Sequence, residues 1–524
     1  MENEKTEMEN PVQENAADAA LDKASMHWSM QLAHEVMQRG KEPYVISAGM
    51  TTSGPCHLGT LCEFLYPQGI KKALGMQGKK ATYYFVADIF DAFDGVPVVF
   101  EKYKAELEPH LGKPLTSVPD PTGKTASFGE HFMEEAQGIM RHFGVEAQVL
   151  KANELYEKGA FDKHAKLFLQ QEEKVKEVVA RTSLRKELPE DWSPLMPVCE
   201  KCGRIATTRV TWHDDVSYKY ACERDVKYTK GCGFSGANRL TDHKYKLNWR
   251  LHWPSWMDYF GTSIEGAGVD HHTRGGSWDT LVAVFREIFK KEPPVGYKFG
   301  FILFEGKKYS KSKGTGMGVS QLMKLLPPEA IKYMLLKPDL QENIDINPTS
   351  TNMLRLLEDY QGAVVLIGQD EEKMSRAERK RLQAARLSKI NEWKTPFLDA
   401  VLYRQLYGSW EEVAKQSKDE AGVKYLAPYI EEWEKQGFIP EEYSYRYAPQ
   451  KAQGKVREYF EGMREGMGPL DIHNSIFEFA KANSVAPAEF FRSIYQLLLG
   501  KDKGPKLGKF LHALGVMRVK KDVL

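Results

Sequence analysis

The sequence predicts an α/β fold in which a doubly wound parallel sheet is interrupted by a cysteine-containing insertion and followed by an all-α C-terminal domain. β-prone runs alternate with amphipathic helical stretches in the first part of the chain, and this alternation resumes after residue 262. Beyond Pro327, helical patterns follow one another with few β-prone runs. At 524 residues the chain is long enough for several domains.

The pattern of apolar residues predicts the strands and helices in each half of the sheet. In the first half, a helix from residue 130 to 143 would place Phe132, Met133 and Ala136 on one apolar face. We expect the first half over residues 21–150, with strands at 44–47, 82–87 and 145–150 and a further helix opening near His57. We expect the second half over residues 246–326, with strands at 263–268 and 297–304 and a helix at 278–290.

The remaining segments differ from the sheet region in composition. Residues 1–20 carry six acids against one base and are expected to form a disordered acidic tail. The insertion is expected over 151–245 and begins with one charged helix, 161–184. A helical connecting region, 327–370, and an α-helical domain, 371–524, complete the expected order, with helices at 330–336, 352–366, 373–390, 453–464, 473–482 and 487–499.

Composition limits the location and the partners of the chain. The net charge is only +1, so a nucleic-acid partner would have to be held by local basic patches. Two such patches are present: seven bases against one acid lie within 373–389, and seven bases against two acids lie within 501–524. A solvated helix face would have a similar composition. Since no apolar stretch approaches the ~18 residues of a membrane span, a cytoplasmic chain without a membrane partner is expected.

Two loops have the composition of phosphate-binding segments. Residues 53–60 lie between an expected strand and an expected helix, where backbone amides and the positive end of a helix favour an anion. Residues 307–314 contain four lysines interleaved with serine and glycine, which suits a mobile loop that closes on a triphosphate. A histidine in a turn is usually structural and a short lysine run is usually solvated, so the pair is a stronger signal than either loop.

Four of the six cysteines form a group that indicates a metal site. Four thiolates complete a closed tetrahedral zinc site, which has no open position for chemistry, so the expected role of zinc is structural. Nearby glycines permit the tight turns of a zinc knuckle, and His213 and His243 are interpreted as ordinary residues outside the ligand set. The expected ligands are Cys199, Cys202, Cys222 and Cys232.

The two loops resemble the HIGH and KMSKS signatures of class I aminoacyl-tRNA synthetases, here His57-Leu58-Gly59-Thr60 and Lys308-Tyr309-Ser310-Lys311-Ser312. Thr60 and Tyr309 are departures from those signatures, and neither removes a phosphate ligand. Segments 112–116, 118–121, 246–250, 270–271 and 275–279 are similar to those of archaeal-type class I lysyl-tRNA synthetases, a resemblance that covers about residues 25–350.

The resemblance implies a Rossmann-type catalytic domain that uses ATP and Mg²⁺ to activate L-lysine and transfers it to the 3′ end of tRNA(Lys). It also implies a monomer whose C-terminal α-helical domain binds the anticodon, and a part for tRNA in the activation step. The implied catalytic residues are His57, Gly59, Thr60, Lys308, Ser310, Lys311 and Ser312; Gly268, Asp270 and Lys311 would bind ATP; and Gly49, Thr51, Ser53, Trp249, His271 and Tyr297 would bind lysine.

Some alternatives stay open at this point. Trp249, Trp253 and Trp256 have the spacing of a buried helical stripe as well as that of an aromatic pocket. His271 is equally compatible with a core histidine. At the level of function, the rivals are a synthetase for another amino acid and a catalytically inactive, zinc-containing RNA-binding or regulatory protein, against which the intact Lys308, Lys311 and His57 argue.

Overall fold

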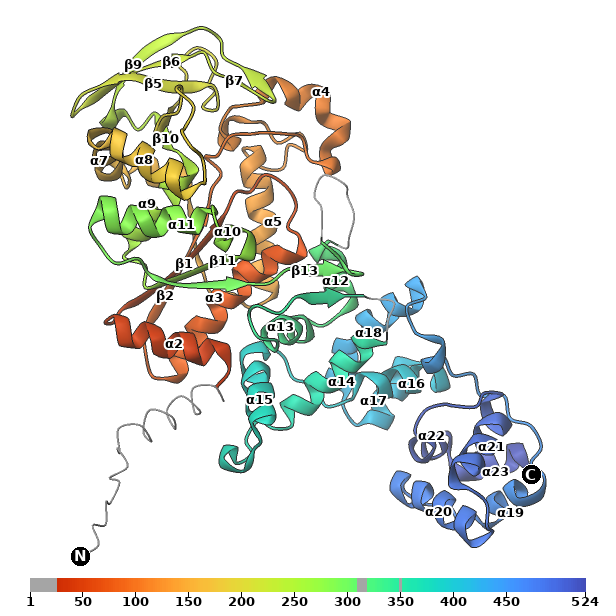
Figure 1. The fold of residues 1–524 in the computed structure, drawn as a ribbon. Helices are drawn as coiled ribbons and strands as arrows, with labels where there is room; N and C mark the ends of the chain where they lie inside the picture. Colours follow the sequence, from red (N-terminus) through yellow and green to blue (C-terminus); the bar gives the residue numbers. More distant parts are fainter. Residues whose placement is uncertain (1–25, 309–317, 348–350) are drawn as a thin grey trace, which may run out of the picture. The chain divides into compact units, whose positions relative to one another are not determined.

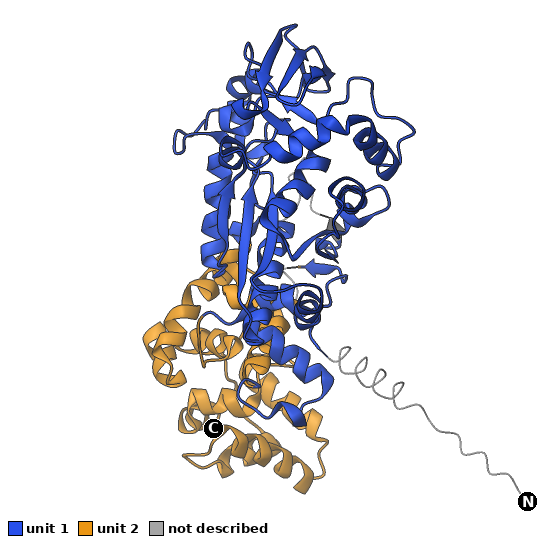
Figure 2. Cartoon of the chain, turned by 90° about the vertical axis from the view of Figure 1, so that its left-hand side faces the viewer, with its two compact units in different colours: residues 1–321, 331–346, 366–390 blue, residues 322–330, 347–365, 391–524 orange. Residues whose placement is uncertain are grey.

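A computed structural model describes residues 26–308, 318–347 and 351–524. The chain forms two compact units (Figure 2). Unit 1 comprises residues 1–321, 331–346 and 366–390, and unit 2 comprises 322–330, 347–365 and 391–524. The segment 366–390 is therefore grouped with the sheet-containing unit, and the expected domain boundaries, including that after residue 370, stay predictions.

A five-stranded parallel sheet forms the centre of unit 1 (Figure 1). All neighbouring strands are parallel, and the sheet order is β12-β11-β1-β2-β3. The chain moves from β1 outward to β3 on one side and from β11 to β12 on the other, so the order reverses between β1 and β11. The strands are β1 (Tyr44–Met50), β2 (Ala81–Ala87), β3 (Gln148–Lys151), β11 (Ile264–Gly268) and β12 (Val295–Phe299).

Helices connect these strands and bury their apolar faces, as expected for a doubly wound sheet. Helix α3 (Leu58–Met76) packs on β1, β2 and β11, and α2 (Trp28–Arg39) packs on α3. Helix α5 (Phe128–His142) begins where the Ser127 side chain accepts a hydrogen bond from the Glu130 amide, and its expected apolar face is buried. Along the chain, helix α9 (Trp249–Phe260) precedes β11. Three short helices connect β11 to β12: α10 (Val269–His272), α11 (Ser277–Ala283) and the π-helix η5 (Val284–Phe289).

The insertion contains helices and a small separate sheet. Strands β5 (Thr208–His213), β6 (Ser217–Cys222) and β9 (Ser235–Arg239) form an antiparallel sheet. Strand β4 (Leu195–Pro197) pairs with β10 (Tyr245–Leu247), so the beginning and the end of the cysteine-containing segment lie side by side. The α/β class, the parallel sheet and the insertion predicted from the sequence are thus confirmed.

Two predicted elements are wrong in detail. The single helix expected at 161–184 is two helices, α7 (Asp162–Gln170) and α8 (Glu172–Thr182), because Gln171 between them has non-helical backbone angles. The strand expected at 297–304 is likewise two strands in different sheets. Its first part belongs to β12, and its second part is β13 (Ile302–Phe304), which pairs with β14 (Lys307–Lys308) and β15 (Ile344–Ile346).

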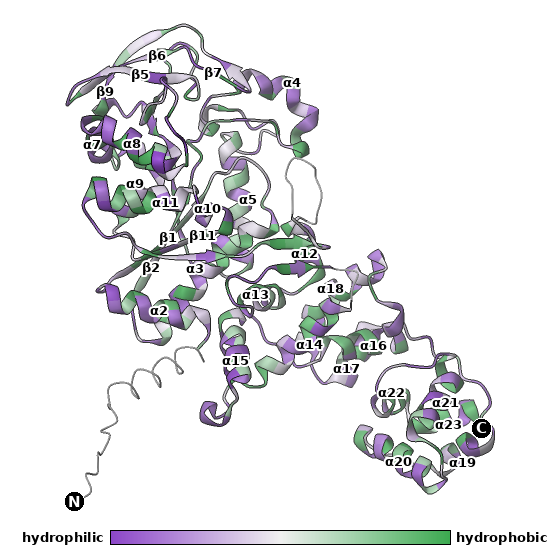
Figure 3. Ribbon diagram, viewed as in Figure 1, coloured by the Kyte–Doolittle hydropathy of each residue, from purple (hydrophilic) through white to green (hydrophobic). Residues whose placement is uncertain are grey.

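The described part of unit 2 consists of helices joined by loops, without strands, as predicted for the C-terminal part. Helices α19 (Gly454–Gly462), α20 (Pro469–Ala482) and α21 (Pro487–Leu499) surround a core that includes Phe460, Ile476 and Ile494. Each of these helices carries both hydrophobic and hydrophilic residues, as amphipathic helices do (Figure 3). Within the described parts of the chain, no helix is long and apolar enough to cross a membrane.

Candidate active site

The reversal of strand order between β1 and β11 marks the edge of the sheet where a ligand is expected. In open α/β sheets, ligands bind at the carboxyl ends of the strands, at the point where the strand order reverses. The segment after β1 contains Thr51, Ser53 and His57, and the segment after β11 contains Asp270 and His271. Two groups of residues that are far apart in the sequence therefore emerge from neighbouring strands.

The segment after β1 is fixed by hydrogen bonds and leads into α3. The Thr52 hydroxyl donates to the carbonyl of Gly129 at 2.9 Å, and the Thr51 hydroxyl donates to Asp91 Oδ2 at 3.1 Å. At the start of α3, the His57 amide donates to the Thr60 hydroxyl at 3.2 Å. The buried Thr60 thus caps the helix, and the positive end of this 19-residue helix faces the carboxyl edge of the sheet.

Gly59 leaves room for the side chain of His57. A Cβ added at position 59 would lie 3.0 Å from a carbon of the imidazole ring, closer than real Cβ contacts usually come. The small residue therefore lets the ring lie over the first turn of α3, beside the helix N-terminus. The sequence pattern His-x-Gly-Thr is explained locally by this contact and by the Thr60 cap.

The segment after β11 is held by an arginine. Arg250 donates to the carbonyls of Gly275 and Gly276 at 3.0 Å each and to the Thr280 hydroxyl at 2.7 Å. Gly268 ends β11 and precedes α10, where Asp270 is exposed. The interpretation of His271 as a core histidine fits only in part, because its ring contacts Trp253 and lies 3.1 Å from the Ser277 hydroxyl, yet it keeps some exposure.

Of the three tryptophans of α9, two are buried as a helical stripe predicts, and one is partly exposed as an aromatic pocket would require. Trp253 and Trp256 are buried, and their indole N–H groups donate to Glu265 at 2.6 and 3.1 Å. Trp249 stacks on Trp253 with ring centroids 5.6 Å apart and remains partly exposed. Gly49 in β1 has no side chain to collide with Trp256. Gly49, Trp249 and His271 are therefore brought together around the same pair of buried indoles.

Tyr297 lies on the face of β11 opposite to the face that carries Glu265 and the tryptophans. Glu265 and Gly266 are successive strand residues, so they point to opposite faces, and the Tyr297 ring covers Gly266. Burial raises the pKa of the Tyr297 hydroxyl well above its ordinary value, and the nearby Glu63 raises it further. The structure thus places Tyr297 apart from Trp249 and His271, against α3.

Glu63 of α3 is a candidate site residue that sequence reasoning missed. Burial, and then repulsion from Glu265, raises the pKa of its carboxyl to about 8. Glu63 retains partial exposure, and among the described residues no side chain donates a hydrogen bond to its carboxylate. Glu265 differs, because it accepts from Ser47, Trp253 and Trp256. The available signal was an acid inside the otherwise apolar run 61–66.

The second signature lies mostly outside the described residues. Lys308 ends the short strand β14, which pairs Lys308 with Leu303 of β13. Ser310, Lys311 and Ser312 fall within 309–317, which is not described. The assignment of these three residues therefore stays a prediction from the sequence.

The four predicted metal ligands do come together. The sulfur atoms of Cys199, Cys202, Cys222 and Cys232 all lie within 4.8 Å of one another, with Cys199 and Cys232 at 3.6 Å and Cys202 and Cys222 at 3.7 Å. A tetrahedral ion with metal–sulfur bonds of about 2.3 Å requires sulfur atoms about 3.8 Å apart. The cluster therefore has the spacing that zinc requires.

Local backbone geometry explains this spacing. Gly203 and Gly233 follow a cysteine and have φ values of +74° and +75°, the left-handed region that glycine adopts readily. The Thr207 hydroxyl lies 3.2 Å from the Cys222 sulfur. His213 and His243 lie outside the cluster, as predicted, and contact Glu172 and Asp162 instead.

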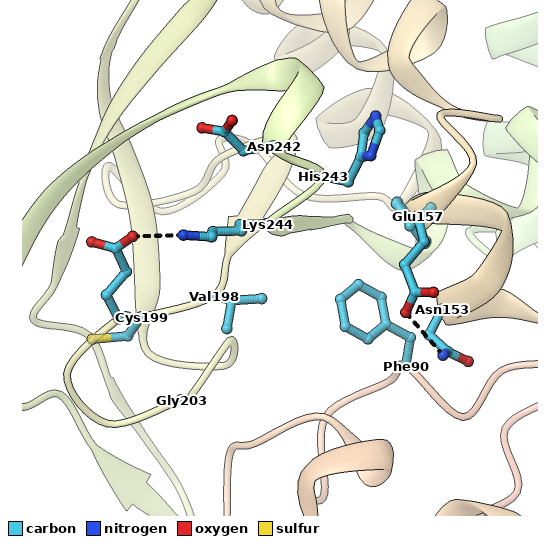
Figure 4. Close-up of a pocket in the computed structure, with 11 residues that line it drawn as sticks. Phe90, Asn153, Glu157, Val198, Cys199, Gly203, Asp242, His243 and Lys244 are labelled. Atoms are coloured by element: carbon cyan, nitrogen blue, oxygen red, sulfur yellow. Dashed lines mark hydrogen bonds and ion pairs between the residues drawn. The ribbon is translucent and has the colours of Figure 1, made fainter.

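A cavity of about 720 Å³ lies beside the cysteine cluster (Figure 4). Phe90, from the segment after β2, faces it from one side, and residues around Cys199 and residues 242–244, just before β10, line the other. Of the predicted site residues, Cys199 alone is among the described residues that line this cavity. The cavity therefore connects the cysteine cluster with the segment that follows β2.

Comparison with known proteins adds independent evidence. The family model described as tRNA synthetases class I (K) matches residues 26–390. The chain is similar to a lysine–tRNA ligase of Archaeoglobus fulgidus, with 29% identity over 95% of this chain and 99% of the relative. It is also similar to those of Methanosarcina barkeri, with 27% identity over 93% and 95% of the two chains, and of Methanocaldococcus jannaschii, with 29% over 94% and 98%.

The match extends over the sheet, the cysteine insertion and the segments that carry both signatures. The structure places His57 and Asp270 after neighbouring strands at the edge where such sheets bind ligands. The matched residues and this arrangement agree with the resemblance seen in the sequence motifs, and the chain therefore belongs to the class I lysyl-tRNA synthetase family.

Proposed function

We propose that this chain is a lysine–tRNA ligase whose reaction takes place at the carboxyl ends of β1 and β11. A carboxylate oxygen of L-lysine attacks the α-phosphorus of ATP, pyrophosphate leaves, and lysyl-adenylate forms. A hydroxyl of the terminal ribose of tRNA(Lys) then attacks the lysyl carbonyl, and AMP leaves. The observation that carries this proposal is the emergence of the His57 segment and the Asp270 segment from adjacent strands at the reversal point of the sheet.

ATP is assigned to the N-terminal end of α3. The helix end and the imidazole of His57 would face the phosphates, and Gly268 and Asp270 would face the ribose. Lys308 and Lys311 would supply positive charge as pyrophosphate departs, because charge stabilisation is the main requirement of this step. Mg²⁺ would accompany the triphosphate. Gly59 and Thr60 serve the site by shaping the first turn of α3.

Lysine is assigned to the region between Thr51 and Glu63. Gly49, Thr51 and Ser53 would hold the amino and carboxylate end, which places the carboxylate near the phosphates. The side-chain ammonium needs a charged partner to offset its desolvation, and Glu63 is a partly exposed carboxylate near the Tyr297 hydroxyl. Trp249 and His271 lie on the opposite face of β11 from Tyr297 and would bound the amino and carboxylate end, where Gly49 lies against Trp256.

Zinc is assigned to the four cysteines, where it would hold the turns of the insertion together without taking part in the reaction. The charge pattern supports the binding of tRNA phosphates to two surfaces. One is helix α15 (Arg376–Ser388) in unit 1, and the other is the basic C-terminal segment, 501–524, in unit 2. The anticodon is assigned to residues 371–524.

Lysine-dependent exchange of pyrophosphate into ATP tests this proposal. The full-length protein, freed of nucleic acid, should show weak exchange alone and clear exchange after addition of tRNA(Lys), because bound tRNA would order the site before activation. Exchange that depends on another amino acid would contradict the assignment of lysine. Brisk exchange without tRNA would leave the ligase assignment intact and show that tRNA has no part in activation.

A further inference from the structure

A largely buried ion cluster contacts the segment that follows β1 through Asp91. The Lys246 ammonium of β10 is 3.0 Å from Asp88 Oδ2 and 3.5 Å from Asp91 Oδ1. His252 of α9 lies 3.4 Å from the same oxygen of Asp88. The side chains of Asp88, Lys246 and His252 have no solvent exposure. The cluster therefore joins three elements: the end of β2, strand β10 and helix α9.

The charges in this cluster hold one another in place. Burial opposes the charged form of Lys246, but Asp88 and then Asp91 raise its pKa above the ordinary value. Burial also opposes ionisation of Asp88, yet Lys246 brings the pKa of that carboxyl below its usual range. Removing one partner of such a buried set leaves an uncompensated charge, which is far more costly than losing a surface pair. The relative positions of Lys246 and the two aspartates are thus strongly constrained.

Asp91 extends this constraint to the candidate amino-acid site. Its Oδ2 accepts a hydrogen bond from the Thr51 hydroxyl at 3.1 Å, while its Oδ1 faces Lys246 and accepts from the Ala92 amide at 3.0 Å. Both oxygens of Asp91 are therefore engaged, one on the side of the ion cluster and one on the side of Thr51. Thr51 itself is partly exposed, so its other side is available to a ligand.

Lys246 is also tied to the cysteine insertion. It pairs with Met196 of β4, and the Val198 amide just beyond β4 donates to the carbonyl of Lys244 at 2.9 Å, next to the metal ligand Cys199. Phe90 lies between Asp88 and Asp91 in the sequence and lines the cavity beside Cys199 (Figure 4). The same short segment, 88–91, thus faces the insertion with one side chain and the ion cluster with two.

We propose that Asp91 and Lys246 are positioning residues for recognition of the amino acid. Lys246, carried by the β4–β10 ladder beside the cysteine cluster, holds Asp91, and Asp91 holds the Thr51 hydroxyl at the end of β1. The insertion thereby fixes one wall of the amino-acid site through two side chains that do not touch the substrate. This role rests on the proposed function, because it requires Thr51 to contact the amino acid.

Kinetics of the full-length protein in charging of tRNA(Lys) test the role. Asparagine has a single acceptor oxygen and cannot replace both carboxylate contacts, so Asp91→Asn should raise the KM for lysine about tenfold. The KM values for ATP and tRNA should change less than about twofold. Thr51→Val should raise the lysine KM, whereas Thr51→Ser, which keeps the hydroxyl, should stay near the wild type. If Asp91 acts through Thr51, the Asp91→Asn, Thr51→Val double variant should resemble Thr51→Val alone.

Lys246→Met extends the series, and Lys244→Ala is its matched control. Lys244 lies two residues away, is exposed and pairs with Glu200 at 2.9 Å, so its loss should leave all three KM values unchanged. Should Lys246→Met fail to fold, Asp91→Asn decides the question, since the Asp91 side chain is 31% exposed. An unchanged lysine KM in Asp91→Asn, an equal rise in all three KM values, or fully additive effects with Thr51→Val would overturn the role. A wild-type chain that charges no lysine would overturn the proposed function and this role with it.

Discussion

The ring of Tyr297 in β12 lies directly over Gly266 in β11, in the space that a side chain at position 266 would fill. The two residues are register partners, so the tyrosine reaches across the strand toward α3 and the Glu63 carboxylate. Glycine at 266 therefore makes room for the Tyr297 ring.

Gly266→Ala should displace the Tyr297 ring. The added methyl group overpacks a buried position, so we expect a loss of stability of roughly 1–3 kcal/mol and a higher KM for lysine than for the wild type. Thermal unfolding and charging kinetics measure the two effects. Gly75→Ala in α3 is the control, because position 75 has open space around it, and it should leave lysine KM unchanged. Equal behaviour of the two variants would contradict a role for Gly266 in placing Tyr297.

Binding of lysine should release a proton from Glu63. The pKa of about 8 means that the free protein carries a neutral Glu63 at pH 7, and an ammonium placed beside it favours the ionised form. Calorimetry in buffers of different ionisation heat should show release of about one proton per lysine at pH 7. For the same reason, lysine affinity should increase as pH rises toward 8.

Glu63→Gln should abolish this proton release and weaken lysine binding. The half-exposed Glu35 of α2, which pairs with Arg39, provides the control: Glu35→Gln should release the same number of protons as the wild type. Proton release that persists in Glu63→Gln would assign the titration to another group and remove Glu63 from the lysine site.

The purified protein should contain about one zinc ion per chain, because four thiolates at these distances complete a tetrahedral site. Cys202→Ser should lose the metal and lower the temperature of unfolding, since metal binding contributes directly to folding. Cys56→Ser, which alters a cysteine outside the cluster, should retain it. Metal-free wild-type protein by elemental analysis would contradict the zinc assignment.

Lys311→Ala should slow adenylate formation by about 10²–10³-fold with a much smaller change in lysine binding, because its charge is needed as pyrophosphate leaves. Lys79→Ala is the control, because Lys79 lies outside both loops, pairs with Glu42 at 3.2 Å and should tolerate the change. Single-turnover formation of adenylate, in the presence of tRNA, separates the two effects. A variant that alters only the lysine KM would show that Lys311 does not act on the triphosphate.

Local patterns predicted the sheet, the insertion and the cysteine cluster because each rests on short-range information. Alternation of strand and helix signals predicts a parallel sheet, and four cysteines near glycines predict a closed metal site. The division of 161–184 at Gln171 was not predictable, since glutamine is a good helix former and no glycine or proline marks the break.

The candidate site needed contacts between distant residues. The spacing of Trp249, Trp253 and Trp256 predicted a helix face but could not show that the last two are tied to Glu265 while the first stays partly exposed. Glu63 and Lys246 were missed as site residues for the same reason: a charged residue gains its meaning only from partners on other elements, whether it lies in an apolar run, as Glu63 does, or among other polar residues, as Lys246 does.

Charging of tRNA(Lys) with each of the twenty amino acids, by the full-length protein with ATP and Mg²⁺, measures the function of the chain itself. We expect lysine to be attached to the 3′ end and the other amino acids to be attached far more slowly. Efficient attachment of a different amino acid would contradict the lysine site built on Glu63 and Tyr297. Failure to attach any amino acid, by protein that binds tRNA(Lys), would contradict the ligase function itself.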